Sequence, residues 1–319
     1  MIDFRYHLVS LVAVFLALAS GVALGSGPLG AELSDGLLGE ADKDRETIEA
    51  QRLELSAANQ VADFNDAFAS AVDGSVLDGL LDGTTVTVFA LPNANSATVE
   101  AVIEELQVAG ADVVGQVGVA TALVDATNRT TAQNLATEVL RGVEGVPTVE
   151  EAGSYEVVGY AIAQGLLATE LPGAPVDAKA QEIQSAFEGA EYLTYDGGDV
   201  TRRGGLAVVV AGDAKTKGGQ AQGEVLAAML DSMDSMSGGL VLAGPLETQQ
   251  APGFIAGLLN SDATSRVSTV DMVETVAGRI VTVLALAEQA GESSGHYGAG
   301  AGADQVLPKL PVNAAPAGR

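Results

Sequence analysis

The sequence predicts an α/β protein with an N-terminal single transmembrane helix, a helical coiled-coil stalk and an extracytoplasmic α/β domain with a mainly parallel sheet. Three observations predict this organisation. The run from Leu8 to Ala31 has no charged side chain, the next segment is charged with a helical pattern, and from Thr84 strand and helix patterns alternate. The predicted parts are a transmembrane anchor at 1–31, a stalk at 32–74, an α/β domain at 84–290 and a flexible Gly/Ala/Pro-rich tail at 291–319.

The first predicted element is a membrane anchor through residues 8–27. A helix rises about 1.5 Å per residue, so about 20 apolar residues cross the hydrocarbon layer of a bilayer. A cleaved signal peptide is one alternative, since Ala17-Leu18-Ala19 has the small-residue spacing of a cleavage site, and a buried core helix is another. The chain stays apolar through Leu24, which favours a retained anchor. Arg5 precedes the span and acidic residues follow it, which predicts a single-pass protein of the cell membrane with a cytoplasmic N-terminus and an extracytoplasmic C-terminal domain.

The stalk prediction depends on a heptad column. Ile48, Leu55, Ala62 and Ala69 recur every seven residues, as one apolar column of a coiled coil does. The companion column is mostly polar and consists of Asp44, Gln51, Ala58 and Asn65. Two interpretations follow: a homodimeric stalk with its contact at Ile48, Leu55 and Ala62, which we favour, and a single solvated helix.

The remainder of the sequence predicts alternating strands and helices. A β-branched run from Thr84 precedes a helix with Ser96 as its N-cap and Gly110 as its stop, and a second strand follows at 111–119. Strand, crossover helix and strand form a βαβ unit, so these two strands are expected to be parallel. The later expected helices are 129–141, 156–170, 177–188, 219–233, 253–260 and 278–290, and the later expected strands are 190–195, 204–214, 238–245 and 265–271.

Composition excludes several function classes. The chain has 42 acidic and 15 basic residues, a net charge of −27, which argues against binding nucleic acid or anionic lipid headgroups through a basic surface. The absence of cysteine removes thiolate metal sites and cysteine nucleophiles. Gly291 to Gly295 match G-x-S-x-G, but a helix precedes the motif and a glycine-rich tail follows it, so the strand–turn–helix context of a nucleophile elbow is missing. We therefore expect no enzyme.

One stretch resembles a metal site. Met229, Met233 and Met236 lie at i, i+4 and i+7 of an expected helix, which places three thioethers on one face, and thioethers are ligands suited to Cu(I). Leu226 and Leu230 lie on the same stripe, so the methionines also fit a core-filling role. Copper is thus the one metal that the sequence offers a candidate site for, and the core is the simpler interpretation.

The two ends of the chain resemble a known family. The apolar segment HLVSLVAVFLALASGVALGSG with its acidic stalk, Ser-Thr-Val-Asp at 268–271, Gly-Arg at 278–279 and Gly-His-Tyr-Gly at 295–298 resemble the MctB-type copper transport proteins of mycolate-envelope actinobacteria. The resemblance implies copper efflux or homeostasis, and some members of that family are described as outer-membrane channels. The family also includes SteB-like septal proteins. Resemblance to these implies a SteA-like membrane protein as partner and control of peptidoglycan hydrolysis in septal envelope assembly.

Two function classes therefore remain open. The first is an envelope protein of the copper transport family that contributes to copper tolerance. The second is a non-catalytic dimeric scaffold in cell division, with an anchor, a stalk and an α/β domain that presents a surface to partners. The resemblance favours the first class, whereas the single expected membrane crossing and the scarcity of metal-binding side chains favour the second.

Overall fold

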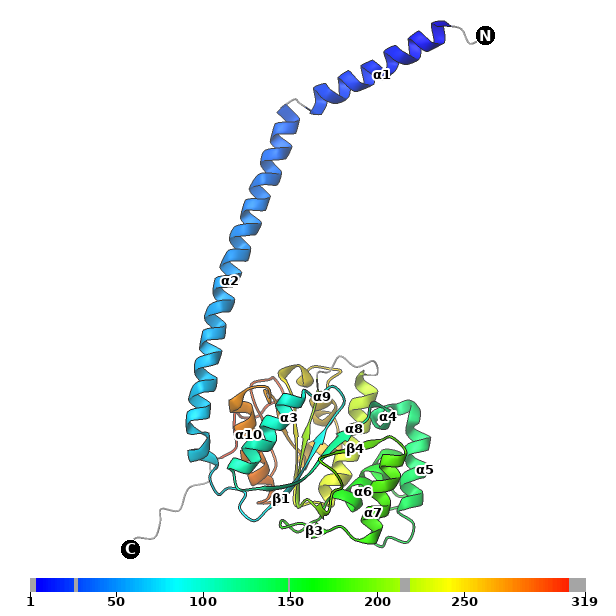
Figure 1. The fold of residues 1–319 in the computed structure, drawn as a ribbon, viewed down its shortest axis with the longest axis vertical. Coiled ribbons are helices and arrows are strands. Elements are labelled where there is room, and N and C mark those ends of the chain that lie inside the picture. The colour runs from blue at the N-terminus through cyan, green and yellow to red at the C-terminus, as the bar shows by residue number, and fades with distance from the viewer. Residues whose placement is uncertain (1–3, 26–27, 149, 213–218, 310–319) are drawn as a thin grey trace. The chain divides into compact units, whose positions relative to one another are not determined.

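The computed structural model describes residues 4–25, 28–148, 150–212 and 219–309, and it divides into two compact units, Met1–Phe64 and Asn65–Arg319 (Figure 1). The first unit consists of helix α1 (Phe4–Gly25) and most of helix α2 (Pro28–Leu77). The segment Arg5–Gly25 has a mean hydropathy of 2.4 and none of it is buried, so by length and composition it is the one candidate membrane span among the described residues. The expected N-terminal apolar helix and the long helix after it are both confirmed.

The second unit is built on a seven-stranded sheet in the order β4-β2-β1-β6-β7-β8-β9. Every neighbouring pair is parallel except β2 with β4, which confirms the predicted mainly parallel sheet. The chain runs from β1 outward to β2 and then returns to add β6 on the other side of β1, which makes the sheet doubly wound. The strands are β1 (Thr85–Ala90), β2 (Asp112–Val119), β4 (Leu193–Asp196), β6 (Leu206–Val210), β7 (Leu240–Ala243), β8 (Ser268–Val270) and β9 (His296–Tyr297), and a separate small pair joins β3 (Ala174–Pro175) to β5 (Arg202–Arg203).

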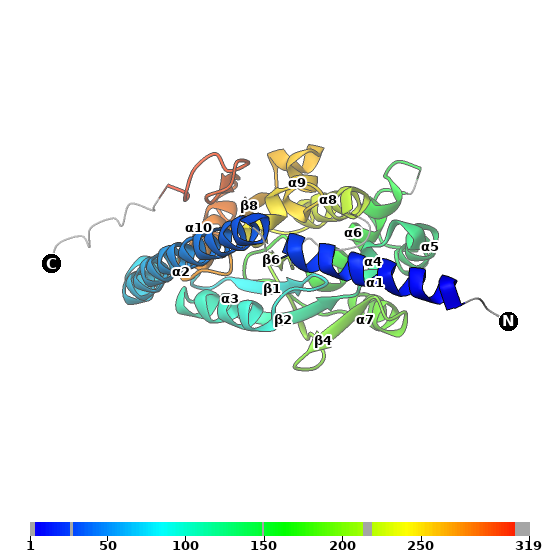
Figure 2. The same ribbon diagram turned by 90° about the horizontal axis from the view of Figure 1, so that it is seen from above.

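Helices cover both faces of this sheet, as Figures 1 and 2 show. Strand β6 illustrates why two cores form: Ala207 and Val209 point into one apolar cluster and Val208 points into the other, because side chains alternate along a strand. The first cluster receives α5, α6, α7, α8 and α9, and the second receives the end of α2, α3 and α10. The helices are α3 (Ser96–Val108), α4 (Thr121–Val124), α5 (Arg129–Val139), α6 (Ser154–Leu166), α7 (Ala178–Gly189), α8 (Gly219–Ser235), α9 (Phe254–Leu259) and α10 (Val276–Gln289), with 3₁₀ turns η1 (Ala126–Asn128), η2 (Leu246–Gln249) and η3 (Asp262–Ser265).

Helix α3 begins at Ser96, one residue earlier than an N-cap at Ser96 would allow. Asn95, not Ser96, is the N-cap, and its side-chain oxygen accepts hydrogen bonds from the backbone N–H groups of Ala97 and Thr98. Both residue types cap helices well, so the sequence alone does not choose between neighbours. Gly110 follows the helix with φ +89°, as expected of a stop residue.

The C-terminal segment differs most from the prediction of a flexible tail at 291–319. Strand β9 pairs with β8 through His296 and Tyr297, and the following loop donates the backbone N–H groups of Ala299 and Gly300 to the buried carboxylate of Asp271, at 2.7 and 2.8 Å. Glycine makes this possible, because a Cβ at position 298 would overlap that carboxylate. The glycine content that indicated flexibility therefore serves close packing, and residues 310–319 lie outside the described residues.

Candidate functional site

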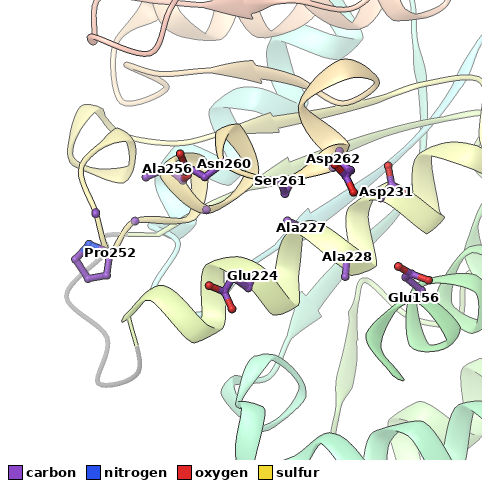
Figure 3. A pocket seen from close by; sticks show the side chains of 14 residues that line it. Glu156, Glu224, Ala227, Ala228, Asp231, Pro252, Ala256, Asn260, Ser261 and Asp262 are labelled. Carbon is purple, nitrogen blue, oxygen red and sulfur yellow. Dashed lines mark hydrogen bonds between the residues drawn. The ribbon is translucent and has the colours of Figure 1, made fainter. Parts of the chain in front are cut away.

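Helices α8 and α9 approach each other closely at one point and leave a groove beside it. A Cβ on Gly257 of α9 would overlap the backbone of Gly223 on α8, so only glycine permits this crossing. The groove has a volume of about 540 Å³, and its apolar lining includes Ala227, Ala228 and Ala256. Figure 3 shows the side chains of α8 on one wall and those of α9 and η3 on the other.

Carboxylates dominate the polar lining of this groove. Glu156 comes from α6, Glu224 and Asp231 from α8, and Asp262 from η3, and no lysine or arginine is among the described residues that line it. Arg266 lies at its margin and binds Asp231, with Nε 3.0 Å from Oδ1, and this partner raises the pKa of the guanidinium. The groove therefore suits a small cationic group by charge, but it brings together no nucleophile with a base. Sequence reasoning missed it, because these carboxylates come from separate segments with no common spacing.

A second carboxylate next to this ion pair has an unusual environment. Asp234 is largely buried on α8, its Oδ1 has no hydrogen-bond partner, and burial raises its pKa to about 6. Arg266 opposes that shift, although its direct partner is Asp231. Asp234 lines a separate polar pocket with Ser237 and Gln289 near the start of β7.

The structure places two of the three candidate copper-binding methionines in the core. Met229 and Met233 are each 2% exposed and belong to the apolar cluster between the sheet and α8, where the backbone of Met229 lies against Gly159 of α6. Met236 is half-buried and packs at the edge of that cluster. Among the described residues, no group of three or more His, Cys, Asp or Glu side chains could hold a metal ion. Copper binding by the methionines stays a prediction, and their burial favours the core-filling role.

The predicted stalk residues lie on the exposed surface of α2. Ile48 is 47% exposed, Leu55 is 62% exposed and Ala62 is exposed, whereas Ala69, the fourth member of the column, is buried in the second unit. Dimerisation through this column stays a prediction. Sequence reasoning missed a second set of exposed apolar side chains on the same helix: Leu53, Val61, Phe64 and Phe68.

The C-terminal motifs that carry the family resemblance lie at one edge of the sheet. The side chain of Asp271 accepts hydrogen bonds from Gln249 and from the loop after β9, and Gln249 in turn accepts one from Gly302. His296 is held between the hydroxyls of Thr264 and Thr269, each 3.0 Å from a ring nitrogen, and burial lowers its pKa. These residues fasten the sheet edge by internal hydrogen bonds, which is a structural role.

Comparisons with known proteins agree with this resemblance. The family model described as "Copper transport outer membrane protein, MctB" matches residues 1–308. The chain is 29% identical over 317 residues to the protein named "Copper transporter MctB" from Mycobacterium tuberculosis and to that from Mycobacterium bovis, with 96% of this chain and 99% of each relative covered. The protein of the same name from Mycobacterium leprae matches with the same identity and coverage. Because the family model extends over nearly all of the sequence, the chain belongs to the MctB family of copper transport proteins.

Proposed function

We propose that this protein is a single-pass, membrane-anchored envelope protein that contributes to copper efflux or homeostasis. The observation that carries the proposal is the extent of the match: 96% of the chain aligns with 99% of relatives named copper transporters. In this proposal the helix Arg5–Gly25 crosses the cell membrane with its N-terminus in the cytoplasm, and the α/β domain works outside.

The proposed mechanism cannot be a pore made by one copy of this helix, since a single helix encloses no channel. Copper would have to pass through an assembly with other subunits, or be handled by the extracytoplasmic domain. Thioethers are the soft ligands that the chain offers, and Met236 is the most accessible of the three candidates. Met229 and Met233 could bind copper only if α8 moved away from the core, because both are 2% exposed.

The test is the copper content of cells that lack the protein. We expect copper to rise in a deletion strain and to return to the normal level when the wild-type gene is restored. A variant with Met229, Met233 and Met236 all changed to Leu keeps the apolar volume and removes every candidate thioether. If it restores copper as well as the wild type, the methionines are core residues only. Unchanged copper in the deletion strain would overturn the copper proposal.

A second candidate function is a non-catalytic dimeric scaffold in cell division and septal envelope assembly. The observation that favours it is the exposed apolar surface of α2, which includes Ile48 and Leu55. In this proposal the stalk forms a homodimer and a SteA-like membrane protein is its partner, with regulation of peptidoglycan hydrolysis as the outcome. The partner and the regulation of hydrolysis follow from the family resemblance, whereas the homodimer follows from the heptad column of α2.

Two measurements separate the scaffold from the copper function. Deletion should produce division defects at low external copper, where a transport defect has no consequence. In detergent, light scattering should show the full-length chain as a dimer, and a monomer would contradict the dimeric scaffold. Normal septa in the deletion strain would contradict the scaffold, whatever the copper content.

A further inference from the structure

Helix α2 carries a second apolar stripe, on the side away from the predicted column. Leu53 is 73% exposed, Val61 is 59% exposed, Phe64 is 69% exposed, and Ala57 between them is exposed as well. We call these four residues the Leu53–Phe64 stripe. The chain has only 7 phenylalanines, and a large aromatic side chain on a solvated helix costs free energy unless something covers it.

The spacing of the stripe is that of a coiled-coil seam. A series of apolar positions runs along α2 at 50, 53, 57, 61, 64, 68 and 71, with separations of three or four residues. An average separation of about 3.5 residues is the period at which two helices wrap around each other. The column of Ile48, Leu55 and Ala62 lies about 140–180° around the helix from this stripe, at about 100° per residue, so one partner helix cannot cover both.

We propose that the Leu53–Phe64 stripe, and not the Ile48–Leu55–Ala62 column, is the face through which α2 binds α2 of a second copy in parallel. The proposal rests on the dimeric stalk of the scaffold function and names its contact face. It goes beyond that function because a dimer could equally form through the predicted column.

The exposed area is suited to a second copy held in the same membrane. The stripe exposes on the order of 400 Å² of apolar side chain per copy, so a symmetric contact covers on the order of 800 Å² in total, about half of a typical specific interface between free proteins. Tethering both copies to one membrane raises their effective concentration and so lowers the area that is needed.

Helix α1, which precedes α2, also has a surface that α1 of a second copy could contact. Ala17, Gly21 and Gly25 lie at intervals of four residues on α1, and no atom lies within 4 Å of the Cβ position that either glycine would add. Leu18 and Val22 flank a shallow groove at Gly21. Small residues at this spacing let two membrane helices approach closely, so α1 and α2 each present an uncovered face to another helix.

The absence of cysteine from the sequence allows a direct test in membranes. Ala57→Cys places a thiol in the stripe, and Ala62→Cys places one in the predicted column. The two alanines are a matched pair, since both are exposed and they lie only five residues apart on one helix. Full-length chains with two tags of different size are expressed together, oxidised with diamide, and separated on a non-reducing gel. Three dimer bands identify a second copy, whereas two displaced bands, one for each tag, identify a different protein.

We expect Ala57→Cys to form disulfide-linked dimers at least fivefold faster than Ala62→Cys, and Phe64→Asp in the Ala57→Cys background to abolish that difference. Faster crosslinking of Ala62→Cys would overturn this proposal and leave the dimeric stalk intact. If neither thiol crosslinks to a second copy, the stripe and the dimeric stalk both fail.

Discussion

Two helices of this protein carry apolar side chains at similar helical spacing and use them in different ways. On α8, Met229 and Met233 lie in the core at 2% exposure each, whereas on α2, Leu53 and Phe64 are 73% and 69% exposed. Spacing defines a face on a helix, and only the surrounding structure decides whether that face is core or contact surface. The buried methionines of α8 therefore fit a core role, and the exposed side chains of α2 are the better candidates for a contact surface.

The largest expected effect is the loss of stability when a charge is placed on the buried face of α8. The same change on the exposed face of α2 is the control. Met229→Asp should destabilise the α/β domain by about 4 kcal/mol or more, because it buries a carboxylate without a partner. Leu53→Asp should leave that domain within about 0.5 kcal/mol of the wild type, because position 53 is exposed. Hydrogen exchange of the β6 amide groups in the full-length chain reports on the domain alone. Comparable loss of protection in both variants would show that the two helices do not differ as the burial indicates.

A smaller loss of stability is expected at the sheet edge, where the buried side chain of Asp271 holds the loop after β9 by hydrogen bonds. Asp271→Ala should destabilise the domain by about 3 kcal/mol, because it removes a buried charged acceptor and leaves the N–H groups of Ala299 and Gly300 unpaired. Asp262→Ala is the matched control, since Asp262 is an exposed carboxylate. Urea unfolding measures both variants. A loss below about 1 kcal/mol for Asp271→Ala would mean that β9 is held by something else.

Much of the fold could be predicted because the patterns involved are local. The uncharged run that became α1, the β-branched run that became β1 and the glycine-bounded run that became β6 each have a composition that specifies their structure without reference to distant residues. The tail could not be predicted in this way. Its glycines permit both a flexible chain and a tight approach, and only the position of Asp271 selects the second.

The candidate site was harder to predict for the same reason. The groove between α8 and α9 depends on a contact between Gly223 and Gly257, and its carboxylates come from three separate elements. On α2 the strict seven-residue column at Ile48 was easier to recognise than the stripe, whose separations of three and four residues shift along the helix. Both sets are exposed, and the stripe differs in carrying an aromatic side chain, Phe64.

The smallest effect concerns Asp234, the largely buried carboxylate on α8 whose pKa is raised to about 6. The folded state binds this proton more tightly than the unfolded state, in which an aspartate has a pKa of about 3.9. The stabilising contribution of protonation is therefore fully present below about pH 4 and is lost as the pH rises through about 6. Asp234→Asn removes the charge, so at pH 7.5 we expect the variant to be more stable than the wild type by about 2 kcal/mol, and the difference to vanish near pH 4.

Urea unfolding of both proteins between pH 4 and pH 8 measures this difference directly, because the other titrating groups contribute equally to each. Asp199→Asn, at an exposed position, is the matched control and should show no such trend. A difference that grows as the pH falls would mean that Asp234 is stabilised as a carboxylate in the folded protein. In that case the ion pair of Arg266 with Asp231 would have to extend to Asp234, and α8 would carry a charge network on the opposite side from its buried methionines.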